Sequence, residues 1–350
     1  MDLNVKWCMD LNRQRVKLVN KQIIVLVTIV LYITLLGCSK AKRDPQNEFN
    51  LLSQAPIDLG VISSDATSVA FLNGGLVTVS DVRTAEVKHQ FKLNKQTKVS
   101  GISLSQDNKL LLVSFDTQLS VWDLDKNSLV GQFTVVGHSK FAKISQVAIY
   151  ANPMFVLVGM TDGTLNLIDF ENSLTKQVKL HDARISHLEL GEYRQLVMTA
   201  GHDGQVKLSH IDSLSLKYSY SLHKRVTSAA TGQRNETLFV SDALNEQLLL
   251  RPFSNVSEPI KLVYRERFRW FRAAALSPNG EYLATGSSKY WWTLWDANNG
   301  REIDAFAIEA ATSTAMILDM HFSKGNILTT LSSDGIVEFW DINTLASKQH

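Results

Sequence analysis

The chain has 350 residues, of which 45% are hydrophobic and 20% charged, with 18 Gly, 6 Pro and 2 Cys. This balance excludes a disordered, collagenous or disulfide-stapled protein. The formal net charge is +2, but residues 1–37 hold five Lys and Arg against two Asp, so the remainder is close to neutral. A polycationic protein that binds nucleic acid is therefore not expected.

The N-terminal segment has the composition of a secretory signal. Basic residues precede the mostly apolar residues 23–36, a run of 14 residues that is shorter than the roughly 20 residues of a membrane-spanning helix. The run ends in the tetrapeptide Leu35–Cys38. This segment resembles the lipobox of bacterial lipoproteins, in which the cysteine is acylated, with palmitate among the chains, and becomes the first mature residue. The resemblance predicts a signal peptide at residues 1–37 and lipidation at Cys38.

The same resemblance predicts a compartment. It implies the periplasmic face of the outer membrane, because Ser39 follows the cysteine where Asp would favour retention in the inner membrane. The inner membrane is the alternative location, and an uncleaved, tilted anchor is the alternative form of the segment. Met-Asp-Leu-Asn occurs at Met1 and again at Met9, and either start leaves the mature protein unchanged. Residues 38–47 are polar and are expected to form a short tether.

Residues 48–350 contain a pattern that repeats about every 43 residues. The seven copies end at Asp81, Asp123, Asp169, His210, Pro252, Asp296 and Asp341. An apolar motif lies about 20 residues before each end, and turns such as Asp203-Gly204 lie between the two. Four short strands in each copy, separated by Gly and Asp turns, are typical of the blades of a β-propeller.

These motifs resemble those of the WD40 family, which implies an all-β, seven-bladed propeller that acts as an interaction platform. In that family a His, a Ser or Thr, an Asp and a Trp form a buried hydrogen-bonded tetrad in each blade. The His and Trp positions are filled in different repeats, by His138, His181 and His223 and by Trp122, Trp295 and Trp340. No repeat has both residues, so we expect the blades to depend mainly on apolar packing between sheets.

The last repeat is incomplete. Nine residues follow Asp341, and they lack a counterpart of the strand around Phe133–Val135 in the second repeat. The apolar residues 48–52 are expected to supply that strand, which would close the ring and leave no open sheet edge. The alternative is that residues 48–53 belong to the tether.

A cationic residue occupies the same register in four consecutive repeats, directly before the first apolar position of the first-strand motif. The residues are Lys98, Lys143, Arg184 and Arg225, and Trp270 takes the place in the sixth repeat. Equivalent positions of a closed propeller lie on a ring, so we expect these charges at the mouth of the central channel. The alternative is that they are solvated strand ends.

Basic and aromatic residues also gather in two loops of the sixth repeat. They are Arg267, Arg269 and Trp270 before its first strand, and Lys289 and Tyr290 after its second. Both loops belong to one face of a propeller, and this composition is typical of an interface hot spot. The alternative is that Trp270 and one of Trp291 or Trp292 pack between blades.

Enzyme chemistry has little support in the sequence, which contains no Gly-rich phosphate loop, no Cys pair with the spacing of a zinc site and no nucleophile elbow, and no cofactor is expected. The one metal-like constellation pairs His181 and Asp182 with His202 and Asp203. The resemblance to WD40 repeats places His181 and Asp203 in the hydrogen-bonded tetrad, which favours a structural role over a metal site.

The leading prediction is a membrane-anchored, monomeric propeller that binds another protein, expected to be acidic, without catalysis and without nucleic acid. Two alternatives remain open. The first is an accessory factor in the assembly of outer-membrane proteins. The second is an enzyme or binding protein that acts on an anionic glycan or lipid of the envelope.

Overall fold

The computed structural model describes residues 48–347 except 94–97, 152–153, 192–194, 234–235, 245, 256–257 and 264–269. The chain divides into two units, residues 1–42 and 43–350, and only the second contains described residues. The predicted signal peptide, the lipidation site Cys38 and the tether therefore lie outside the described residues.

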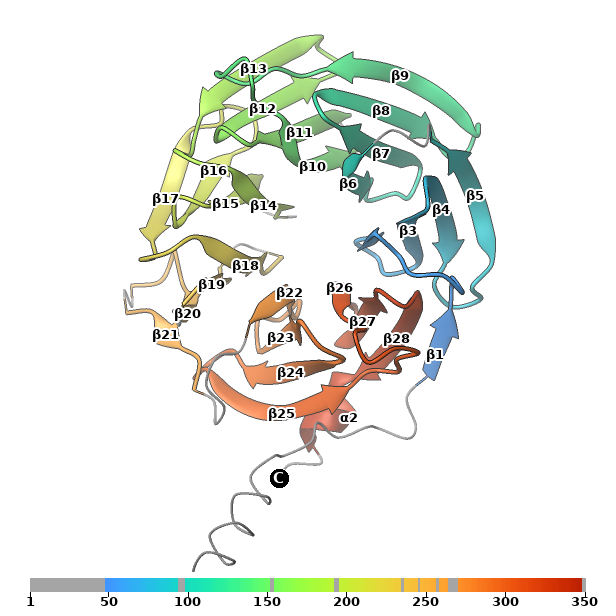
Figure 1. The fold of residues 1–350 in the computed structure, drawn as a ribbon. Helices are drawn as coiled ribbons and strands as arrows, with labels where there is room; N and C mark the ends of the chain where they lie inside the picture. Colours follow the sequence, from blue (N-terminus) through green and yellow to red (C-terminus); the bar gives the residue numbers. More distant parts are fainter. Residues whose placement is uncertain are drawn as a thin grey trace, which may run out of the picture. The chain divides into compact units, whose positions relative to one another are not determined.

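The second unit is a seven-bladed β-propeller, as the repeats predict (Figure 1). Each blade is a four-stranded antiparallel sheet whose first strand lies nearest the centre of the ring and whose fourth lies at the periphery. Blade 1 contains β2 (Leu59–Ile62), β3 (Ser68–Asn73), β4 (Leu76–Asp81) and β5 (Val87–Lys92). Blade 2 contains β6 (Val99–Leu104), β7 (Leu110–Phe115), β8 (Gln118–Asp123) and β9 (Ser128–Thr134). Blade 3 contains β10 (Ile144–Tyr150), β11 (Phe155–Met160), β12 (Thr164–Asp169) and β13 (Leu174–Lys179).

The remaining blades follow the same order along the chain. Blade 4 contains β14 (Ile185–Leu190), β15 (Leu196–Gly201), β16 (Gln205–His210) and β17 (Leu216–Ser221). Blade 5 contains β18 (Val226–Thr231), β19 (Leu238–Asp242), β20 (Gln247–Leu250) and β21 (Ile260–Lys261). Blade 6 contains β22 (Phe271–Leu276), β23 (Tyr282–Ser287), β24 (Trp291–Asp296) and β25 (Arg301–Ala307). Blade 7 contains β26 (Ile317–Ser323), β27 (Ile327–Ser332), β28 (Ile336–Asp341) and, as its fourth strand, β1 (Glu48–Leu51).

The core lies between neighbouring sheets. All six residues of β11 are buried, because both faces of the sheet are covered, whereas the peripheral strand β13 has no buried residue. One cluster joins Leu112 and Val121 of blade 2 to Ile144 and Val158 of blade 3. The predicted dependence on apolar packing between sheets agrees with such clusters.

The ring closes as predicted, because β1 pairs antiparallel with β28. Side chains strengthen the seam between blades 7 and 1. Asn50 Nδ2 donates to the carbonyl oxygens of Val82 and Arg83 at 2.9 and 2.7 Å. The backbone N–H of Ile62 donates to Asp319 Oδ2 at 2.7 Å. The N-terminal strand of the ring is therefore held by two blades.

Two elements differ from the sequence expectations. The chain forms a short helix after β28, α2 (Ile342–Ser347), where the sequence indicated only a missing strand. Asp341 caps α2 by accepting hydrogen bonds from the backbone N–H and hydroxyl of Thr344 at 3.2 and 2.7 Å. The fourth strand of blade 5 is reduced to the two residues of β21, which directly follow Pro259, a residue that cannot donate to a sheet. Within the described ranges, no helix has the length and apolar character to cross a bilayer.

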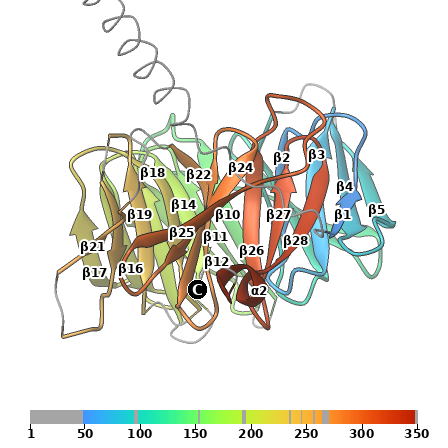
Figure 2. The same cartoon turned by 90° about the horizontal axis from the view of Figure 1, so that it is seen from below.

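The two faces of the propeller can be named from these elements. The cationic face is the one on which Lys98, Lys143, Arg184, Arg225 and Trp270 precede the innermost strands. The helix face is the opposite one, where the innermost strands end and α2 lies (Figure 2).

Candidate interaction surface

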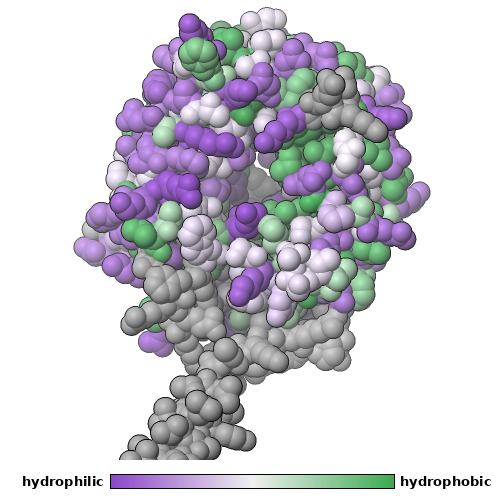
Figure 3. All heavy atoms as spheres, viewed as in Figure 1, coloured by the Kyte–Doolittle hydropathy of each residue, from purple (hydrophilic) through white to green (hydrophobic). Residues whose placement is uncertain are grey.

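The predicted ring cations all lie on the cationic face. Lys98, Lys143, Arg184 and Arg225 are exposed, and each immediately precedes the innermost strand of its blade. The carbonyl oxygens of Lys143, Arg184 and Arg225 each accept a hydrogen bond from the turn between strands two and three of the same blade, at 2.8, 2.9 and 3.1 Å. These three residues are therefore equivalent in register, and Lys98 occupies the same place directly before β6. The surface seen along the propeller axis is hollowed at its centre (Figure 3).

The cations differ in how much charge they leave uncompensated. Lys143 Nζ lies 2.9 Å from Asp116 Oδ1 in an exposed ion pair, which offsets its charge. Arg184 and Arg225 instead act together on His202. Burial and then these two guanidinium groups lower the pKa of His202, so its imidazole is neutral at pH 7. Two of the ring cations, Arg184 and Arg225, therefore lie near the same imidazole at the mouths of blades 4 and 5.

The structure places Trp270 beside the second loop of blade 6. Phe271 of β22 pairs with Ser287 of β23, which places Trp270 beside the turn that holds Lys289 and Tyr290. Trp270 is 55% exposed and Tyr290 is 41% exposed. The aromatic cluster is therefore open to a partner on the cationic face.

The core role in blade 6 belongs to another tryptophan. Trp292 is fully buried and packs against Phe306 and Trp340, with ring centroids 4.8 and 5.2 Å away. Lys289 Nζ lies 5.2 Å from the ring centroid of Trp291, close enough for a cation–π contact. The predicted site residues Arg267 and Arg269 lie outside the described residues.

Sequence reasoning missed one cation at this surface, Arg272. Each innermost strand of blades 2 to 7 has a register irregularity after its first residue. The residue at that irregularity is Ser100, Ser145, Ser186 and Thr227 in blades 2 to 5. In blade 6 it is Arg272, which is exposed and has Nη1 3.0 Å from Met316 Sδ. A comparison of the second position of the strand motif would have found this substitution of a cation for a hydroxyl.

Exposed apolar side chains mark the same face. Phe141, in the turn before β10, is 78% exposed, and Leu244, in the turn after β19, is 58% exposed. Lys140 Nζ lies 5.0 Å from the ring centroid of Phe141. Together with Trp270 and Tyr290, these residues place apolar surface beside the cations, as in protein-docking sites.

His181 has the contacts of a structural residue. Its Nδ1 lies 3.0 Å from both carboxylate oxygens of Asp203, and its Nε2 lies 2.9 Å from Thr199 Oγ1. Burial raises the pKa of Asp203, but the hydrogen bond and charge of His181 and nearby backbone N–H groups outweigh it and lower that pKa to about 2. Asp182 contributes its backbone N–H to Asp203 at 3.0 Å. No group of three metal-ligating side chains occurs in the part of the chain that the structure describes.

Acidic side chains of the innermost strands link neighbouring blades inside the ring. Glu189 Oε2 of β14 accepts the backbone N–H of Thr231 in blade 5 at 3.0 Å, as Asp319 accepts that of Ile62 across the seam. Burial, with a contribution from the charge of Asp319, raises the pKa of Glu189 to about 8. Burial likewise raises the pKa of Asp319 to about 6. The channel therefore holds protonatable groups that the sequence pattern did not single out.

The fold defines a seven-bladed β-propeller, and one stretch of it matches a known repeat family. The family "WD domain, G-beta repeat" matches residues 86–123, which extend from β5 to the end of β8. Similar proteins include telomerase protein component 1 of Rattus norvegicus, 24% identical over 275 residues, which cover 75% of this chain and 10% of the relative. The same component of Mus musculus is 24% identical over 265 residues, covering 73% and 9%. Protein tipD of Dictyostelium discoideum is 25% identical over 279 residues, covering 76% and 43%.

Each similarity covers only part of the relative's length. The chain spans about a tenth of the length of the two telomerase components and less than half of protein tipD. The similarity therefore concerns a propeller-sized part of each relative.

Proposed function

We propose that the protein is an interaction platform whose cationic face docks an acidic protein partner, and that it has no catalytic activity of its own. The observation that carries the proposal is the gathering of exposed cations and exposed rings on one face. Arg184, Arg225 and Arg272 would attract an anionic surface over long range, whereas Trp270 and Phe141 would supply short-range energy once water is excluded.

The repeat family and the relatives support the same general role. A WD40 propeller offers a rigid disc with variable loops, which suits a protein-binding scaffold. Two of the relatives are named as components of telomerase, and so as parts of an assembly. Fold by itself does not give function, so the argument rests on the surface residues.

The proposal includes an anchor. Cys38 would be lipidated after removal of residues 1–37, and the propeller would be held at the periplasmic face of a bacterial outer membrane. The support is the lipobox-like sequence ending at Cys38. Several acyl chains on one residue hold a soluble domain firmly, whereas one chain holds it only marginally.

The docking proposal is tested by identifying the partner and then changing the charges. A photo-crosslinking residue at position 141 should capture a protein in intact cells, and the same residue at position 129 on the peripheral strand β9 is the control. Capture of only glycan or lipid at position 141 would instead favour the envelope-binding alternative. Capture of an outer-membrane protein precursor would favour the assembly-factor alternative.

The captured partner then allows a kinetic test. Changing Lys98, Arg184 and Arg225 to Ser should slow association about tenfold at low salt and weaken its salt dependence. The matched control changes Lys92, Lys217 and Arg301, which are exposed on peripheral strands, to Ser and removes the same charge. Equal association rates for the two triple variants would refute the docking proposal.

The anchor is tested separately. Cys38→Ala should abolish acyl labelling and leave residues 1–37 attached, as seen by mass spectrometry of the intact protein. A wild-type mature form that begins anywhere other than Cys38 would refute the lipoprotein proposal and leave the docking proposal standing.

A further inference from the structure

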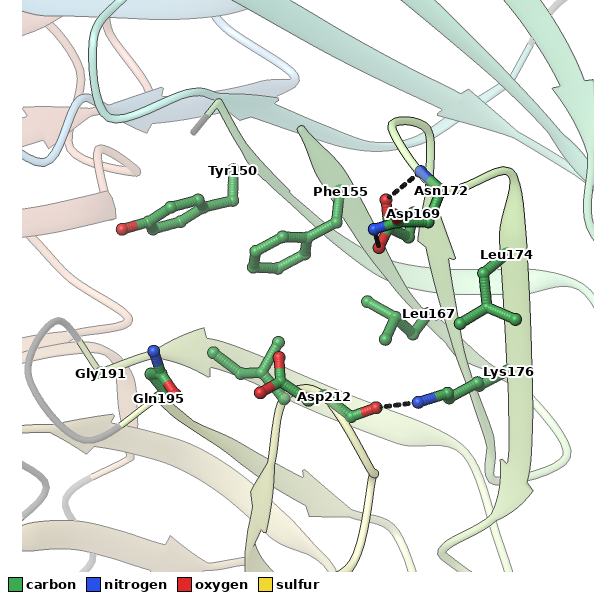
Figure 4. A pocket seen from close by; sticks show the side chains of 11 residues that line it. Tyr150, Phe155, Leu167, Asp169, Asn172, Leu174, Lys176, Gly191, Gln195 and Asp212 are labelled. Carbon is green, nitrogen blue, oxygen red and sulfur yellow. Dashed lines mark hydrogen bonds between the residues drawn. The ribbon is translucent and has the colours of Figure 1, made fainter. Parts of the chain in front are cut away.

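A cavity of about 410 Å³ lies on the helix face, away from the cationic face, between blades 3 and 4 (Figure 4). Residues at the ends of β10, β11 and β12 form one side, and the turn residues Gln195 and Asp212 of blade 4 form the other. Cavities that bind small molecules have volumes of about 300–1,000 Å³, so this one is large enough for a ligand.

The cavity has a flat aromatic wall. The rings of Tyr150 and Phe155 are stacked, with centroids 5.0 Å apart and planes inclined by 11°. Leu167 and Ile211 are buried beside them, and Leu174 is 41% exposed at the edge of the cavity. Such a lining favours a planar apolar group, which can stack on rings and displace water from aliphatic side chains.

The charged groups of the cavity are not equally engaged. Both carboxylate oxygens of Asp169 accept hydrogen bonds from Asn172, at 3.0 and 2.8 Å. Lys176 Nζ donates to the backbone carbonyl oxygen of Asp212. In the described part of the chain, the Asp212 carboxylate itself has no hydrogen bond or ion pair. The lining thus contains two carboxylates against one ammonium, and the Asp212 carboxylate remains available to a cation.

We propose that this cavity binds a small aromatic amine. The ring of the ligand would lie against Tyr150 and Phe155, and its ammonium group would pair with the Asp212 carboxylate. Asp212 lies across the cavity from Phe155 in Figure 4, so a short linker between ring and ammonium fits this arrangement. The same lining disfavours an aromatic acid, because its two carboxylates outnumber the single ammonium of Lys176 and give it a net negative charge.

Three probes with one ring system separate the contributions. Tryptamine, tryptophol and indole-3-propionate share an indole and differ in the charge at the end of a short chain. Titration calorimetry on the purified protein should give tryptamine about tenfold tighter binding than tryptophol, as expected for one charge-assisted hydrogen bond. Indole-3-propionate should bind more weakly than tryptophol. Equal affinities for the three probes would overturn the proposal. So would the absence of tryptamine binding at concentrations up to about 10 mM.

Variants locate the binding. Leu174→Trp at the edge of the cavity should fill it and remove tryptamine binding. Leu216→Trp is the matched control, because Leu216 is the exposed first residue of the equivalent strand β17 in blade 4. Asp212→Asn should reduce the preference for tryptamine over tryptophol to about twofold or less while tryptophol affinity is unchanged. Unaltered tryptamine binding in folded Leu174→Trp protein would place the amine elsewhere and refute the inference.

Discussion

Blades 4 and 6 use the same threonine position for two different buried hydrogen bonds. In blade 6, Trp295 Nε1 donates to Thr285 Oγ1 at 2.8 Å. In blade 4, Ser209 replaces the tryptophan, and the equivalent Thr199 binds His181 Nε2 instead. The four-residue network expected of a WD40 blade is thus divided. Blade 6 keeps the Trp–Thr hydrogen bond, and blade 4 keeps the His–Thr contact. The hydroxyl of Ser209 is itself buried without a hydrogen-bond partner among the described residues, so blade 4 pairs His181 with Thr199 but leaves the substituted position unsatisfied.

Blade 2 keeps the tryptophan but not the threonine. Trp122 occupies the same position as Trp295. The position that corresponds to Thr285, two residues after the cross-strand partner of the tryptophan, is filled by Val113 in this blade. Within the described ranges, Trp122 Nε1 is buried without a hydrogen-bond partner. In blade 2 the tryptophan therefore contributes through packing and not through a hydrogen bond. Its ring contacts that of Phe91, with centroids 4.5 Å apart.

The largest expected effect comes from removing a core tryptophan. Trp295→Ala should lower the free energy of unfolding by about 4 kcal/mol, because Trp295 is fully buried and its loss leaves a cavity. Trp270→Ala is the control on the same blade and should change it by less than about 0.5 kcal/mol, because Trp270 is 55% exposed. Urea denaturation measures both. A similar loss for the two variants would mean that Trp270 packs between blades and is not free to dock a partner.

A smaller loss is expected from the histidine half of the network. His181→Leu should reduce stability by about 3 kcal/mol, because it removes the imidazole that contacts both the Asp203 carboxylate and the Thr199 hydroxyl. His138→Leu at the corresponding position of blade 3 should change stability by less than about 0.5 kcal/mol, since His138 is exposed. Calorimetric melting of both variants tests the contrast. Equal melting temperatures would remove the structural role assigned to His181.

Buried acids should make stability depend on pH in two opposite ways, with Glu189 and Asp319 on one side and Asp203 on the other. The folded pKa of Glu189, about 8, and that of Asp319, about 6, exceed the usual 4.5 and 3.8, so both groups favour the folded state in their protonated form. Their contribution is complete below pH 4 and is lost as the pH rises through 6 and 8. Asp203 has a folded pKa of about 2, below its usual 3.8, so it favours the folded state in its charged form. Its contribution is complete above pH 3.8 and is lost as the pH falls through 2.

Melting temperature against pH tests this contrast. Between pH 6 and 9 the wild-type protein should lose several degrees, and Glu189→Gln should lose clearly less, because Gln keeps a hydrogen-bond acceptor for Thr231 without titrating. Asp203→Asn should leave the slope in this range unchanged. A wild-type slope that Glu189→Gln does not alter would contradict the raised pKa of Glu189.

The smallest effects on stability are expected from substitutions at the threonine position of blades 2 and 6. Val113→Thr should stabilise blade 2 by up to about 1 kcal/mol, because the new hydroxyl can accept from Trp122 Nε1. Thr285→Val should destabilise blade 6 by about 1–2 kcal/mol, because it removes the hydroxyl that accepts the hydrogen bond of Trp295 Nε1. Urea denaturation of the single variants gives both values. Destabilisation by Val113→Thr would show that blade 2 has no room for the hydrogen bond.

The sequence predicts the strands, the blade count and the closure, because repeated apolar positions and turns determine them locally. It does not predict α2, because Ile342–Ser347 could become helical only once β1 had taken the place of a fourth strand. Arg272 was missed because its importance depends on a local irregularity of β22. The raised pKa of Glu189 depends on enclosure within the ring and on Asp319, which is far away in sequence. The cavity beside Tyr150 likewise depends on turns from two blades.

The pairing of β1 with β28 also sets an order of events during folding. Asn50 and Val337 are neighbours in the finished sheet although about 290 residues separate them along the chain. The six blades that use only consecutive strands can each form from a local stretch of chain, as soon as that stretch is available. Blade 7 cannot be completed until the last segment has emerged, so β1 is the strand that remains unpaired for the longest time. A chain that is cut short before Ile336 would therefore expose the unpaired β1 and the part of blade 1 that Val337 and Phe339 normally cover, and quality control could recognise it as unfinished.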